Sequence, residues 1–264
     1  MGEANKKKRR KEAFLKEHPF CCFCGGAAPA TTWDHVPSRQ MFDGRRRPKG
    51  LEVPACKACN SATSRYEQIA AMCGRIFPDA TDPSVSEETA KIIKAVNRSD
   101  PGLLEEMQAS PEQMSRLPGI RQHVPQAAGV LNCNGPLLNQ AVEIFGAKLG
   151  FALHYWKTGR IVPKGGGVSV RWYTNYNFVD GSFPEHILSI MGAPVTLRQG
   201  SQSVAEQFRF GFAIPETQEM GAYLSTFRLS FAVLSWVSED AKVFPEAARP
   251  VLKPGCFQDL HKAS

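Results

Sequence analysis

The stretch LEVPACKACN at residues 51–60 decides the fold of the first part of the chain, because it ends in a Cys-x-x-Cys pair followed directly by asparagine. A second such pair lies upstream, in the stretch CCFCGG at residues 21–26. Paired cysteines at this spacing are typical of closed tetrahedral zinc sites, which stabilise domains too small to build a large core. Cys22 stands one residue from the first ligand and is the alternative there. We predict a structural zinc ion held by Cys21, Cys24, Cys56 and Cys59.

The sequence around these pairs divides into four regions. They are a basic arm or helix at residues 1–17, a zinc-stapled domain at 18–78, a helical linker region at 79–129 and an accessory domain at 130–264. Within the zinc-stapled domain, β-like runs at 31–33 and 51–53 precede apolar residues at helical spacing from 60 to 77.

The accessory domain combines two periodicities. Apolar residues at helical spacing predict a long helix from Leu137 to Lys157, ended by Gly159. Alternating apolar residues at 208–214 and 223–237 predict an antiparallel pair, extended by a strand at 168–173. We therefore expect an α+β fold.

Positive charge is concentrated near the N-terminus. The 264 residues include 32 Lys and Arg against 25 Asp and Glu, and residues 1–65 hold 14 of the basic and 6 of the acidic ones. A cationic first quarter on a nearly neutral body indicates a polyanionic partner, nucleic acid first and an acidic membrane surface second.

No apolar run approaches the roughly 20 residues that cross a bilayer, and no signal-peptide pattern follows the basic N-terminal run. We expect a cytoplasmic protein that inserts into no membrane and that associates with the nucleoid if the source is bacterial.

The residues between and after the cysteine pairs resemble those of the HNH endonucleases. Asp34-His35-Val36-Pro37 follows the first pair, and Asn60 follows Cys59. Their order and spacing match the zinc-stapled subgroup of that family over residues 18–75. The resemblance implies a ββα-metal, treble-clef-like domain that hydrolyses nucleic-acid phosphodiesters, with DNA as the expected substrate. Many members carry an asparagine that fixes the loop bearing the histidine, where this chain has Gly50.

The chemistry of hydrolysis gives these residues roles that agree with the resemblance. His35 suits the general base that activates water, because its ordinary pKa lies near 6.5. Asp34 and Asn60 offer hard oxygen ligands for a catalytic Mg²⁺ or Mn²⁺ ion. Glu67 lies seven residues past Asn60 on the same helix face, so it is either a further ligand or an exposed carboxylate.

Basic side chains flank this predicted site in the sequence. We expect them to contact nucleic-acid phosphates, although the N-terminal group also reads as a solvated charge run or a nuclear localisation signal. They are Lys7, Arg9 and Arg10 in the arm and Arg45, Arg46, Arg47 and Lys49 in the loop.

Two functions follow from these observations. The first is a metal-dependent endonuclease, and the alternative is a non-catalytic module that binds nucleic acid on the same zinc scaffold. In both, we expect residues 130–264 to control the activity through self-association, a protein partner or a bound effector.

Overall fold

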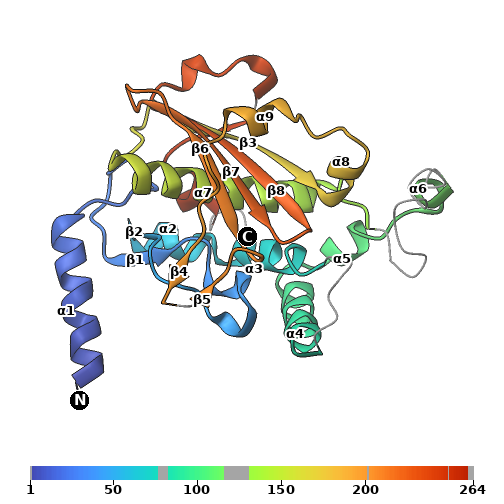
Figure 1. The fold of residues 1–264 in the computed structure, drawn as a ribbon, viewed down its shortest axis with the longest axis horizontal. Coiled ribbons are helices and arrows are strands. Elements are labelled where there is room, and N and C mark those ends of the chain that lie inside the picture. The colour runs from blue at the N-terminus through green and yellow to red at the C-terminus, as the bar shows by residue number, and fades with distance from the viewer. Residues whose placement is uncertain (1, 77–82, 116–130, 201, 249, 261–264) are drawn as a thin grey trace.

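The two predicted β-like runs form a hairpin in the computed structural model, which describes residues 2–76, 83–115, 131–200, 202–248 and 250–260 (Figure 1). Strand β1 (Thr32–His35) pairs antiparallel with β2 (Glu52–Ala55). The basic arm is a helix, α1 (Gly2–Glu17). After the hairpin come α2 (Lys57–Ala62) and α3 (Ser64–Cys73) in place of the single predicted helix, separated at Thr63.

The described residues between 83 and 158 form helices over most of their length. These helices are α4 (Pro83–Ser99), α5 (Leu103–Glu106), α6 (Pro111–Ser115) and the long α7 (Pro136–Thr158). Gly159 ends α7 in the left-handed conformation, with φ of 71°. Most of the predicted linker at 78–83, together with residues 116–130, lies outside the described residues.

The accessory region builds an antiparallel sheet of five strands in the order β6-β7-β8-β3-β9. The stretch 223–237, predicted as one strand, belongs to two strands joined by a turn at residues 228–230. The apolar alternation in the sequence continues through this turn, so the turn was not predicted. The strands are β3 (Gly167–Thr174), β6 (Arg209–Ala213), β7 (Met220–Phe227), β8 (Phe231–Ser238) and β9 (Val251–Leu252).

Short elements complete this region. The hairpin strands β4 (Arg198–Gln199) and β5 (Gln202–Ser203) pair with each other. Helices α8 (Asn175–Val179) and α9 (His186–Ile190) flank one face of the sheet, where Phe183 and Ile187 pack against Leu224 and Leu234. Helix α10 (Cys256–Asp259) ends the described chain.

Helix α7 is central, because it contacts both the five-stranded sheet and the N-terminal unit, which is residues 18–76 with β1, β2, α2 and α3 (Figure 1). Two glycines let it approach the sheet closely. A Cβ atom at Gly146 would lie 2.5 Å from Val170, and one at Gly150 would lie 2.9 Å from Ser235. The backbone of α7 therefore rests directly on β3 and β8.

A single hydrophobic core joins the regions predicted as separate domains. Phe23 and Leu51 from the zinc-stapled region belong to the same buried cluster as Phe145 and Phe257. The N-terminal unit is thus packed against α7 and α10 over apolar surface. Within the described part of the chain, none of the helices has the length and apolar character needed to cross a membrane.

Candidate metal centres and nucleic-acid interface

Four cysteine sulfurs form a buried cluster in the N-terminal unit. The Sγ atoms of the four predicted ligands all lie within 4.8 Å of one another: Cys21, Cys24, Cys56 and Cys59. None of these cysteines forms a disulfide. Zinc–sulfur bonds of about 2.3 Å place tetrahedral sulfurs about 3.8 Å apart, so the cluster needs little adjustment to close around zinc. The donor set fits the predicted structural zinc ion.

The proximity of the thiols shifts their pKa values in opposite directions. Cys59 lowers the pKa of the neighbouring Cys21 to about 5, and Cys21 raises the pKa of Cys59 above its ordinary range. The backbone amide of Cys59 donates to Cys56 Sγ at 3.4 Å. Cys22, the alternative ligand, is buried outside the cluster, so Cys21 takes this position.

The C-terminal helix α10 closes over this cluster. Gln258 Nε2 lies 3.7 Å from Cys59 Sγ and 4.0 Å from Cys56 Sγ, within hydrogen-bonding range of both sulfurs. The amide of Gly255 donates to the carbonyl of Phe23 at 2.9 Å. Donors to metal-bound thiolates orient the ligands and stabilise their charge.

The predicted oxygen ligands converge on a lysine from α7. Lys148 Nζ lies 2.7 Å from Asp34 Oδ2 and 3.0 Å from Glu67 Oε2. With its amide nitrogen turned toward Asp34, Asn60 donates to Oδ2 at 3.1 Å and to Oδ1 at 3.2 Å. Glu67 thus lies close to Asp34, but the group between the two carboxylates is an ammonium.

Burial and charge oppose each other in this cluster. Asp34 is 7% exposed, Glu67 6% and Lys148 1%. Burial raises the pKa of Glu67 to about 7, against the opposing effect of Lys148. Burial alone would lower the pKa of Lys148, but the charges of Glu67 and Asp34 outweigh it and raise that pKa above its ordinary value.

These surroundings do not fit the predicted catalytic Mg²⁺ or Mn²⁺ ion. Magnesium takes octahedral ligands at about 2.0–2.1 Å and usually keeps several waters. Here the Lys148 ammonium already pairs with both carboxylates, and Asn60 faces Asp34. The two carboxylates are also buried, which leaves them little access to a substrate phosphate. We therefore assign no reaction step to a metal in this cluster.

His35 lies on the other side of β1 from Asp34, as alternation along a strand requires. Arg39 Nη2 is 3.2 Å from His35 Nε2, and Glu52 Oε1 is 3.9 Å from His35 Nδ1. Burial, followed by the charge of Arg47, lowers the pKa of His35 to about 4. The imidazole is therefore neutral at pH 7, and its side chain is 22% exposed.

Arg47 braces the loop that carries His35. Its guanidinium donates to the carbonyls of Val36, Pro37 and Leu51 at 2.8–3.0 Å. The side chain is 2% exposed. The predicted phosphate contact is thus wrong for Arg47, because these carbonyls occupy its donors inside the loop.

The other predicted basic residues lie on the surface. Arg45, Arg46 and Lys49 are exposed on the loop, and Arg9 and Arg10 are exposed on α1. The guanidinium of Arg10 lies 5.5 Å from the centre of the Trp33 ring. Lys7 is on α1, and its side chain lies outside the described part of the chain.

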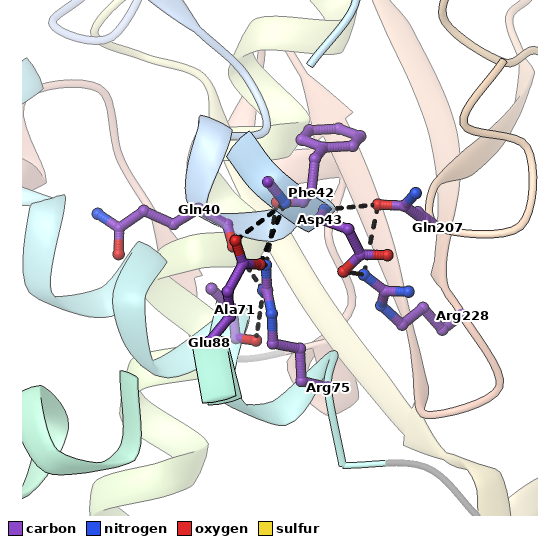
Figure 2. A network of polar contacts seen from close by, with 9 residues as sticks. Gln40, Phe42, Asp43, Ala71, Arg75, Glu88, Gln207 and Arg228 are labelled. Carbon is purple, nitrogen blue, oxygen red and sulfur yellow. Dashed lines mark hydrogen bonds and ion pairs between the residues drawn. The ribbon is translucent and has the colours of Figure 1, made fainter. Parts of the chain in front are cut away.

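The loop between β1 and β2, which carries the exposed arginines, is anchored from two sides, as Figure 2 shows. On one side, Arg75 donates to the Phe42 carbonyl at 3.0 Å, and Glu88 accepts from the amide of Gly44 at 3.0 Å. On the other side, Gln207 and Arg228 from the sheet region contact Asp43 (Figure 2). The segment that presents the arginines is therefore held rigidly against the rest of the protein.

Three of these residues were not among the predicted site residues: Lys148, Gln258 and Arg228. Each lies far along the chain from the group it contacts, and none stands in a recognisable motif. A lysine inside an otherwise apolar helical pattern was the one available signal, at Lys148. Comparisons of the chain with protein-family models, with curated proteins and with solved structures found no match.

Proposed function

We propose that this protein binds nucleic acid through a zinc-stapled N-terminal unit. The observation that favours binding over hydrolysis is the Lys148 ammonium, which pairs with Asp34 and Glu67 at 2.7 and 3.0 Å. Exposed cations on α1 and on the loop supply the phosphate contacts, and the loop that bears Arg45, Arg46 and Lys49 is anchored at Asp43 and Gly44.

We also propose that the N-terminal unit has the ββα-metal fold of the HNH endonucleases. Its hairpin, basic loop and helix follow in the order that the resemblance implies, and two cysteine pairs hold them together. Free cysteines throughout the described chain support the cytoplasm as its compartment. A regulatory role for residues 130–264, through self-association or a partner, remains a prediction.

A metal-dependent endonuclease is the second candidate. Two observations favour it: Asp34 and Glu67 share Lys148 with Asn60 beside Asp34, and His35 is neutral and partly exposed. In that case Lys148 must move away from the carboxylates before a metal can bind. The nucleic-acid-binding proposal requires no such movement.

A salt titration of nucleic-acid binding tests the proposed function. The probe is a short labelled duplex DNA, with single-stranded RNA of the same length beside it, and the readout is fluorescence anisotropy. Replacing Arg45, Arg46 and Lys49 with alanine should lower the slope of log K against log salt by about 0.9 for each phosphate that is no longer neutralised.

The matched control removes three exposed lysines of the accessory region, which changes the net charge by the same amount. The control residues are Lys164, Lys242 and Lys253. Their removal should leave the slope close to the wild-type value. Equal effects of the two triple variants would contradict the assignment of the loop as the interface.

A nicking assay separates the two candidates. Supercoiled plasmid is incubated with the full-length protein in Mg²⁺, in Mn²⁺ and in EDTA. We expect binding without metal-dependent nicking. Nicking that needs a divalent metal and disappears in His35→Ala would establish the endonuclease instead.

A further inference from the structure

The position of Lys148 gives α7 a role inside the zinc-stapled unit. Helix α7 packs against α3 and β2, and Lys148 is the residue that reaches both predicted carboxylate ligands. The ammonium also lies 5.6 Å from the centre of the Phe23 ring, which favours a cation at this point. A buried positive charge is costly unless it is paired, so the carboxylates and the lysine depend on each other.

More oxygen atoms surround the ammonium than the lysine contacts. Glu67 Oε1 is buried and finds no hydrogen-bond donor among the residues that the structure describes. Asn60 turns its nitrogen toward Asp34, and a half-turn of the amide would present its oxygen instead. Carboxylate and amide oxygens are the ligands that Mg²⁺ and Mn²⁺ prefer.

We propose that Lys148 is the resident cation of a latent divalent-metal site formed by Asp34, Asn60 and Glu67. The ammonium occupies the place between the two carboxylates, and a metal ion bridging them would meet its charge at contact distance. The wild-type protein therefore binds no divalent ion here, and removal of the lysine creates a site with oxygen ligands and room for water.

This inference deepens the proposed function, because it says which group keeps the N-terminal unit from holding a catalytic metal. It is tested without nucleic acid, so its failure is distinguishable from a failure of the binding proposal. The readout is Mn²⁺ binding, followed by electron paramagnetic resonance and by calorimetry on full-length, zinc-loaded protein.

Four variants make the test specific. Lys148→Ala should bind one Mn²⁺ ion per chain, with a dissociation constant of about 1 mM or lower. Lys148→Arg keeps the positive charge and should bind none, as in the wild type. Adding Glu67→Gln or Asp34→Asn to Lys148→Ala should weaken Mn²⁺ binding at least tenfold, since each change removes a charged ligand.

Thermal unfolding supplies a second readout, in case Lys148→Ala is unstable without a cation. Mn²⁺ should raise the melting temperature of Lys148→Ala and leave that of the wild type unchanged, because a ligand stabilises only the state that binds it. Stoichiometric Mn²⁺ binding by the wild type that is abolished in Asp34→Asn would overturn the proposal. So would a Lys148→Ala protein that folds and shows no Mn²⁺ binding, or one that fails to fold and gains nothing from Mn²⁺.

Discussion

Arg228 Nη2 donates to Asp43 Oδ1 at 2.6 Å, which joins the turn between β7 and β8 to the loop that carries the exposed arginines. The arginine side chain is only 9% exposed, so salt screens this pair less than a pair on the open surface. Gln207 accepts from the backbone amide of Asp43 at 2.9 Å beside it. The sheet region therefore fixes the backbone from which Arg45 and Arg46 project.

Replacing Arg228 with methionine should weaken duplex binding by about threefold to tenfold. The loop would then lose one of its anchors and be less ordered before binding, so that binding costs more conformational entropy. The salt slope should stay at the wild-type value, because Arg228 is not one of the proposed phosphate contacts. Fluorescence anisotropy at several salt concentrations measures both. A reduced slope would show instead that Arg228 itself meets the phosphates.

Loss of zinc should unfold the N-terminal unit. Cys59→Ser removes one ligand of four, and the metal supplies folding free energy that this unit needs. We expect zinc-free, protease-sensitive protein, measured by elemental analysis and limited proteolysis. Cys133→Ser is the matched control, since Cys133 stands outside the cluster, and it should keep full zinc content. Active wild-type protein without zinc would refute the assignment.

Neighbouring substitutions on β1 should differ sharply in their effect on stability. Asp34→Ala leaves the buried Lys148 with a single carboxylate partner, and we expect a loss of about 3 kcal/mol in the free energy of unfolding. His35→Ala lies on the other face and should cost about 1 kcal/mol or less. Urea unfolding measures both. Similar losses for the two variants would show that the ion pairs contribute little.

Acidification should destabilise the protein through His154. This residue is fully buried, and burial lowers its pKa from 6.5 to about 4, so the folded protein disfavours its protonated form. Its contribution is complete above pH 6.5 and disappears as the pH falls toward 4, by up to about 3 kcal/mol.

The pH dependence can be assigned by removing the histidine together with its partner. Tyr223 Oη lies 3.0 Å from His154 Nδ1, so the double variant His154→Leu/Tyr223→Phe leaves neither group unpaired. Its unfolding free energy should change less between pH 6.5 and 4 than that of the single variant Tyr223→Phe. Identical pH profiles for the two proteins would contradict this role.

The close approach of α7 to the sheet predicts an unusual response to alanine. Alanine normally stabilises a helix by about 1 kcal/mol relative to glycine. At Gly146, however, the new methyl group would lie 2.5 Å from Val170 and 2.8 Å from Val233. We expect Gly146→Ala to lower stability by about 1–3 kcal/mol, measured by chemical unfolding. The exposed Gln140→Ala on the same helix should stay within about 0.5 kcal/mol of the wild type.

The sequence was informative where a short stretch has a regular spacing. The two Cys-x-x-Cys spacings predicted the buried thiol cluster. Helical and alternating periods likewise predicted α7 and most strands of the sheet. Each of these inferences depends on local geometry, which a short stretch of sequence determines.

Contacts between distant segments could not be predicted in the same way. Lys148 reads as one polar residue in an apolar helix until α7 is seen to pack against α3. Arg47 reads as a loop cation until the backbone carbonyls around it are known. Tertiary packing determines which charges are enclosed, and charge counts along the chain contain no information about it.

The closure of α10 over the cysteine cluster also limits access to its sulfurs. The sulfurs come from residues 21–59, whereas the helix that covers them comes from residues 256–259. The cover therefore forms only when these two segments have met in the folded protein. In the finished protein all four ligands are at most 6% exposed. We therefore expect a chelator to remove a bound zinc ion more slowly when α10 stays in place over the sulfurs.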